Sequence, residues 1–335
     1  MDDEPEAITQ ASTAPVPLSV TVSGLVDTEK ATEFAHLLAG YMQALGTVFD
    51  ISRLEALTAT DRYTEALTEV DRGFPASATV TRSENEDIVG IAMCVHVLRA
   101  GVPRIHLVCD IEMVLPLWVF EHGTPEHAQA LQLLAHECAH IEDMKRQDDA
   151  YPGVILQQAH QDWLEAHFMP IGSAVWQEYY ACRRSANFYP DATTAFATSL
   201  ATCLDGNQAV VNEAIRRYRQ HHDLGRLVAE TLDPATRAIK VAAYLFGHLD
   251  GLDQGWDAIP EIRKRLDDHR LNELMEEMVT ELQRLWDMQH EWTGVSDMED
   301  LVEIARDAYA VAGVVAHGTA DGGAHLSVPF TDETT

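Results

Sequence analysis

Apolar residues recur along the chain with two different periods, and each period predicts a different kind of element. From Thr28 to Phe49 they return every three or four positions, the spacing of an amphipathic helix. Asp27 or Thr28 would cap its first turn. Leu18–Val22 predicts a short strand, and Ile51–Val70 a second helical region. The apolar face of the first helix would carry Ala35, Leu38, Met42 and Leu45.

Residues 87 to 110 have the composition of paired strands. Asp87–Arg99 and Arg104–Asp110 are rich in β-branched residues, and the turn signal Ala100–Pro103 separates them. This pattern predicts a β-hairpin. His96 and His106 fall on its strands, where a histidine is more often satisfied by the fold than bound to a ligand.

Helical periodicity dominates after residue 125. Glu261–Trp292 is long and heavily charged, so it predicts either a peripheral amphipathic helix or an arm that binds a partner. The fold class that these patterns predict is α+β and mostly α. The other segments with helical spacing are 195–203, 207–222, 224–231, 234–249 and 297–316, with Asp205-Gly206, Asp233-Pro234 and Thr293-Gly294 as the breaks.

One of these helical segments contains the motif H-E-x-x-H, at residues 136 to 140. Residues four apart lie on the same helix face, so His136 and His140 could both bind one zinc ion. Glu137 would then hold a zinc-bound water and take its proton. The alternative is a helix with two incidental histidines.

A catalytic zinc usually has three protein ligands, so one is missing from the motif. No Gly or third His follows at the spacing that would extend it. Glu178, in a second helical segment that starts at Ser173, is the best candidate. Asp143 could instead orient a ligand imidazole. The rivals for the third position are Asp143, Asp162, Glu165, His160 and His167.

The motif and the downstream Glu178-x-x-Ala181 resemble the gluzincins, the zinc metallopeptidases whose third ligand is Glu. Within them the chain is most similar to the ImmA/IrrE type, over about residues 85 to 190. It differs at Cys182, where many gluzincins have Asp. The resemblance implies a zincin-like core with a small β-sheet beside the H-E-x-x-H helix. The helical periodicity predicts that a helical C-terminal half follows.

We therefore predict four regions along the chain. They are a disordered acidic N-terminus (1–17), a zincin-like metallopeptidase domain (18–190), a helical C-terminal region (191–318) and a flexible tail (319–335).

The predicted function is a zinc-dependent metallopeptidase that hydrolyses peptide bonds through a zinc-bound water activated by Glu137. The edge of the hairpin would bind an extended peptide through main-chain hydrogen bonds. The alternative is a non-catalytic metal-binding or interaction protein that binds a partner through its helical C-terminal half. Candidate oxyanion donors are Tyr179, Tyr180, His160 and His167.

Charge limits the choice of partners. The formal net charge is −31, from 54 acidic and 23 basic residues. Binding to nucleic acid needs a clustered basic surface, and the basic groups at Arg183-Arg184 and Arg216–His222 do not outweigh the acidic background. We expect a peptide or protein substrate and no nucleic acid. The sequence does not determine the oligomeric state.

The cysteines and the hydropathy of the chain predict the cellular compartment of the protein. Five cysteines with no C-x-x-C pair indicate reduced thiols. The first residues are acidic where a secretory signal would be basic, and no run of 18 apolar residues occurs. We expect a cytoplasmic protein with no membrane contact.

Overall fold

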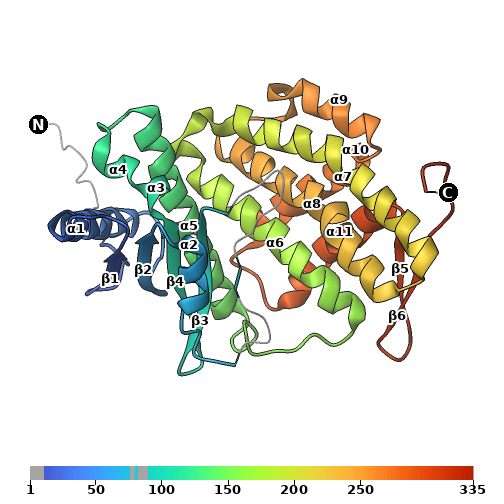
Figure 1. The fold of residues 1–335 in the computed structure, drawn as a ribbon, viewed down its shortest axis with the longest axis horizontal. Coiled ribbons are helices and arrows are strands. Elements are labelled where there is room, and N and C mark those ends of the chain that lie inside the picture. Colours follow the sequence, from blue (N-terminus) through green and yellow to red (C-terminus); the bar gives the residue numbers. More distant parts are fainter. Residues whose placement is uncertain (1–10, 76–79, 82–89, 335) are drawn as a thin grey trace, which may run out of the picture. The chain divides into compact units, whose positions relative to one another are not determined.

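The computed structural model describes residues 11–75, 80–81 and 90–334. Helix accounts for 61% of the chain and the sheets are small, so the α+β, mostly helical class is confirmed. The chain forms two compact units, Met1–Leu156 and Gln157–Thr335 (Figure 1).

Unit 1 is built on a four-stranded sheet in the order β1-β2-β4-β3. β1 (Ser19–Val22), β2 (Leu54–Thr60) and β4 (Val102–Asp110) are parallel, and β3 (Ala92–Arg99) pairs antiparallel with β4. The predicted hairpin is therefore present as β3 and β4, and β3 is an edge strand. The first expected strand is present as β1, and residues 87–89 lie outside the described part.

Successive side chains of a strand point to opposite faces, so β3 has two different faces. Val95 packs with Val108 of β4 and with Tyr63 and Leu67 of α2 (Tyr63–Glu69). Cys94 faces the other way, where its thiol reaches α5 (Pro125–Ala150). The even-numbered residues of β3 thus face the helix that carries the H-E-x-x-H motif.

Three further helices complete unit 1. The first is α1 (Thr28–Leu45), which starts where the sequence predicts, with Asp27 accepting hydrogen bonds from the first-turn N–H groups. The other two, α3 (Ile111–Val114) and α4 (Pro116–Val119), are short and connect β4 to α5.

The prediction of a helical region over Ile51–Val70 is wrong. The structure has β2 and then α2 there. β2 pairs with β1 on one side and β4 on the other. Its apolar residues Leu54 and Leu57 are three apart, which imitates a helical turn. Only pairing with distant strands decides that this segment is extended.

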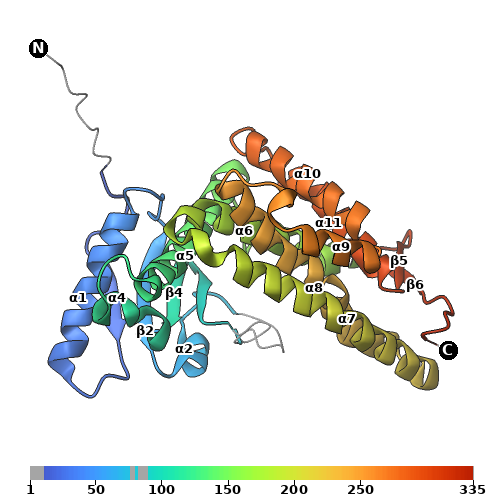
Figure 2. The ribbon, with the colours of Figure 1, turned by 90° about the horizontal axis from the view of Figure 1, so that it is seen from above.

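Unit 2 is mostly helical, and α8 (Leu224–Gly251) lies at its centre (Figures 1 and 2). α8 packs against α6 (Trp163–Ser185), α7 (Thr193–His221), α10 (Asn272–Met288) and α11 (Glu299–Val311). The remaining elements are α9 (Pro260–Asp268), the hairpin of β5 (Val315–Gly318) and β6 (Ala324–Ser327), and the short 3₁₀ helices η1 (Ala186–Phe188), η2 (Pro190–Ala192), η3 (Trp256–Ala258) and η4 (Val295–Met298).

Two of the breaks expected within unit 2 are absent, because a helix continues through them. α7 continues through Asp205-Gly206 and α8 through Asp233-Pro234. By contrast, the expected long helix Glu261–Trp292 is divided into α9 and α10, and Arg270 between them has a left-handed φ of 59°.

The division into compact units follows the packing of the helices. Unit 2 begins at Gln157, before α6, and α6 packs on α8 and α11. The expected tail 319–335 contains β6, and its Thr334 is buried. At the other end, residues 1–10 lie outside the described part. The hydroxyl of Thr13 donates to the carbonyls of Gly46 and Phe49, which follow α1. These bonds attach the segment around Thr13 to unit 1.

Within the described residues, no helix is both long enough and apolar enough to cross a membrane.

Candidate metal centre

Helix α5 holds the two motif histidines on a firmly packed scaffold. Thr124 accepts a hydrogen bond from the N–H of His127, and Pro125 occupies the first helical position. The middle of the helix is buried against β3 and β4 of unit 1. Its completely buried side chains in this stretch are Leu134, Ala135, Cys138, Ala139 and Ile141.

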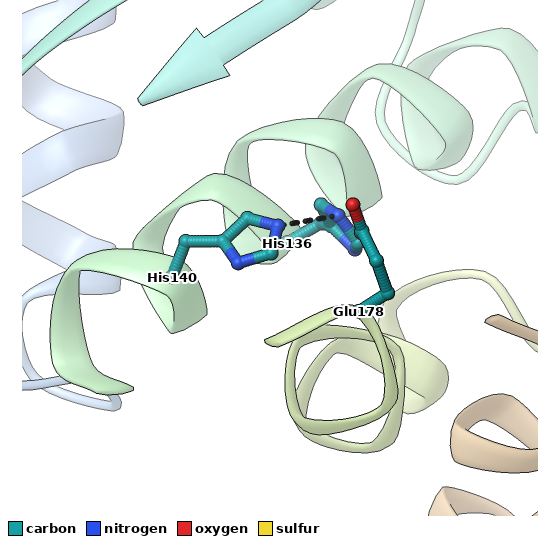
Figure 3. A group of neighbouring side chains, drawn as sticks. All are labelled: His136, His140 and Glu178. Atoms are coloured by element: carbon teal, nitrogen blue, oxygen red, sulfur yellow. Dashed lines mark hydrogen bonds between the residues drawn. The ribbon is translucent and has the colours of Figure 1, made fainter. Parts of the chain in front are cut away.

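His136 and His140 converge on one point beside this helix (Figure 3). Their Nε2 atoms are 3.0 Å apart, and their rings meet edge to face with centroids 4.6 Å apart. Two imidazole nitrogens bound to one tetrahedral zinc, each at about 2.0–2.1 Å, would be about 3.3–3.4 Å apart. A small rotation of the rings would therefore fit the pair to one ion.

Glu178 lies on α6 in unit 2, and α8 fixes its surroundings. Its side chain is mostly buried, and Lys240 of α8 places its Nζ 3.6 Å from Oε1. Lys240 thus forms an ion pair with this carboxylate.

Within the described residues, one group of three His, Cys, Asp or Glu side chains has ligand atoms that all lie within 4.8 Å of one another. It consists of His136, His140 and Glu178 (Figure 3), the same three residues that the sequence predicts as ligands. Two nitrogens and one carboxylate oxygen form a donor set that zinc accepts. The rivals Asp143, Asp162, Glu165, His160 and His167 are not in this group.

Glu137 is buried, and it lies on the side of α5 that faces the sheet. The Cys94 thiol donates to its main-chain carbonyl over 3.4 Å. Burial, and then the negative charge of Glu137, raise the pKa values of Cys94, Cys109 and Cys138 well above their ordinary range. The carboxylate therefore sits among thiols of β3, β4 and α5.

His96 of β3 also lies near the histidine pair. It is on the same face of the strand as Cys94. Burial, followed by the positive charges of His140 and Arg72, lowers its pKa to about 4. His96 is therefore a neutral imidazole at neutral pH. Alternation along the strand predicts that His96 shares a face with Cys94. Which of the two faces meets α5 depends on tertiary contacts.

The two tyrosines and Asp143 are engaged within their own units. Tyr179 donates to Asp250 over 2.5 Å and accepts from Arg183 over 2.6 Å; burial and the Asp250 charge raise its pKa. Tyr180 is buried with its ring 5.4 Å from that of Trp286. Asp143 is buried and accepts from Gln147 over 2.7 Å.

Both accessory histidines lie near the start of α6. His160 is exposed, with Nδ1 3.7 Å from Glu165. His167 stacks on Trp163 and donates from Nδ1 to the carbonyl of that residue over 2.8 Å. Each of the five proposed accessory side chains thus already has a contact near it in the fold. To act in catalysis, the side chain would have to keep this contact as well or give it up.

Comparison of the chain with protein-family models, with curated proteins and with solved structures finds no match.

Proposed function

We propose that the protein is a zinc-dependent metallopeptidase in which His136, His140 and Glu178 bind the ion and Glu137 is the general base. The grouping of these three ligand atoms within 4.8 Å supports it most directly. The gluzincin-like, ImmA/IrrE-type motif and a zincin-like core are part of the same proposal, as is a reducing, cytoplasmic setting, which the five thiols favour.

Zinc held there would supply a Lewis acid for the scissile carbonyl and would make a neighbouring water more acidic. Glu137 then accepts the proton of the attacking water and returns it to the leaving amine.

The edge of β3 is suited to hold an extended peptide. The N–H of Leu98 donates to the carbonyl of Arg72, and the Arg72 side chain donates to the carbonyl of His96, so the main-chain groups of these even-numbered residues point away from β4 and are already engaged. The main-chain groups of Ala92 and Cys94 point to the same edge and are the ones we propose for the peptide. A substrate strand pairing there would lie beside the α5 segment that carries Glu137 and His140.

A second function class is supported by one observation. Glu137 is only 5% exposed, and a glutamate buried to this extent could have a purely structural role. In that case the metal group would belong to a non-catalytic binding protein.

The experiment combines metal analysis with a peptidase assay. Chelator-treated protein is reloaded with zinc and dialysed; we expect about one zinc per chain, and loss of it in His136→Ala and in His140→Ala. Glu137→Gln should keep the zinc and lose turnover of a broad peptide library by at least about 100-fold, because an amide cannot accept the proton.

Full zinc content in the double variant His136→Ala/His140→Ala would refute the site. Turnover that Glu137→Gln leaves unchanged would remove Glu137 as the base. A zinc-loaded wild-type chain that cleaves nothing in the library would favour the non-catalytic function.

A further inference from the structure

The basic group at the end of α7 binds a segment of the chain that follows the β5–β6 hairpin. Arg216 donates to the carbonyl of Glu333. Arg219 donates from Nε to the carbonyl of Thr334 over 2.8 Å and from Nη2 to the carbonyl of Pro329 over 2.9 Å. Two arginines of this basic group are therefore used to hold a peptide segment of the same chain.

Side chains of the held segment add to these main-chain contacts. The guanidinium carbon of Arg219 lies 3.7 Å from the ring centroid of Phe330, a cation–π contact. Its Nη2 also donates to the hydroxyl of Thr334 over 3.2 Å. That hydroxyl contacts Thr331 over 2.9 Å and closes a compact turn. Thr334 is buried.

The surface beneath this segment is hollow. A cavity of about 290 Å³ lies between the segment, α7 and the end of α11. Arg270 and Glu333, which carry opposite charges, both line it. Phe330 remains 77% exposed, so the segment leaves much of its apolar ring unused.

These contacts specify a ligand chemistry. Two arginines bind carbonyl groups that any peptide has, the face of Arg219 accepts an aromatic ring, and Arg270 favours an acidic side chain. We propose that the surface formed by Arg216, Arg219 and Arg270 is a docking site for a short acidic peptide with an aromatic residue, supplied by a partner protein. The segment Pro329–Thr334 occupies it within the chain and competes with the partner.

A labelled peptide with the sequence of residues 328–334 (Val-Pro-Phe-Thr-Asp-Glu-Thr) is the probe, and its fluorescence anisotropy reports binding to the full-length chain. Phe330→Ala with Thr334→Ala weakens the internal segment, and Phe330→Ala alone is a milder second variant. A tethered segment acts at an effective concentration on the order of millimolar. The double variant should therefore bind the probe at least about tenfold more tightly than the wild type.

Arg219→Gln, added to the double variant, should reduce probe binding by at least about tenfold, because it removes the carbonyl contacts and the ring contact. Arg263→Gln is the matched control, since Arg263 is an exposed arginine of α9 that pairs with Glu276. A probe with the same residues in scrambled order should bind less tightly.

Equal probe binding by the wild type and both released variants would overturn the proposal. So would equal losses from Arg219→Gln and Arg263→Gln. A wild-type dimer in size-exclusion chromatography that the double variant loses would also overturn it, because the occupant would then be a second copy of the chain.

Discussion

Glu178 and Glu165 lie on the same helix, and both are candidates from the sequence for the third ligand. Replacing each by Gln keeps its shape and removes its charge. Loss of a group that only orients a metal ligand typically weakens metal binding by roughly 10–100-fold. We expect Glu178→Gln to weaken zinc binding by more than this, and Glu165→Gln to bind zinc almost as the wild type does. Competition with a chromogenic chelator measures both. The ligand assignment fails if the two effects are reversed or equal.

His248 of α8 gives a prediction for pH. It is completely buried, and its Nε2 donates to the carbonyl of Pro190 over 3.2 Å. Burial lowers its pKa, and the hydrogen bond opposes this. As the pH falls, His248 is therefore protonated in the unfolded chain, where its pKa is about 6.5, before it is protonated in the folded protein. The contribution of His248 to the free energy of unfolding is complete above that pH and decreases as the pH drops below it.

The measurement is urea unfolding at pH 7.5 and pH 5.5. The loss of unfolding free energy between these pH values should be smaller in His248→Gln than in the wild type. His290→Gln, at an exposed histidine of unit 2, should lose as much as the wild type. A wild-type loss that persists in His248→Gln would show that other groups carry it.

At the scale of elements, close contact between α6 and α8 fixes the helix that carries Glu178. A Cβ at Gly247 would lie 2.2 Å from the carbonyl oxygen of Tyr179, and one at Gly251 would lie 2.3 Å from that of Arg183. Only glycine lets the two backbones approach this closely. Lys240, on the same helix α8, adds its charge to Glu178.

Gly247→Ala should therefore destabilise the protein by about 1–3 kcal/mol, because the backbone of one helix must move. Gly206→Ala is the control: it lies in α7, and a Cβ there meets nothing within 4 Å. That change should be neutral or stabilise by up to about 1 kcal/mol, since Ala favours helix. Thermal melting compares the two. If Gly247→Ala melts like Gly206→Ala, the close contact does not limit the packing.

Local pattern predicted some elements and missed others for identifiable reasons. The helix over the H-E-x-x-H motif and the β3–β4 hairpin have strong local signals, namely a long uninterrupted helical segment and two β-branched runs around a turn. β2 has no such signal, because Leu54 and Leu57 have helical spacing and its strand partners are distant in sequence. Pro234 was expected to end a helix, but packing of α8 in unit 2 keeps the helix continuous.

At the scale of the molecule, the chain is two compact units joined near Leu156. Residues 157 to 162 are exposed and contain neither helix nor strand. Exposed connections of this kind are preferred sites of proteolysis. Brief digestion with a protease of low specificity should yield two fragments with new ends between residues 157 and 162, identified by mass spectrometry. First cuts within α7 or α8 would contradict this division.

The sequence alone determined what depends on short spacing: the two histidines on one face of a helix, the glutamate between them, the hairpin and the predominance of helix. Tertiary structure decided what depends on contacts between distant residues. It placed β2 in the sheet, turned the Cys94 and His96 face of β3 toward α5, and docked Pro329–Thr334 on Arg216 and Arg219. Spacing fixes direction only within one element, whereas burial and pairing depend on segments far apart in the chain.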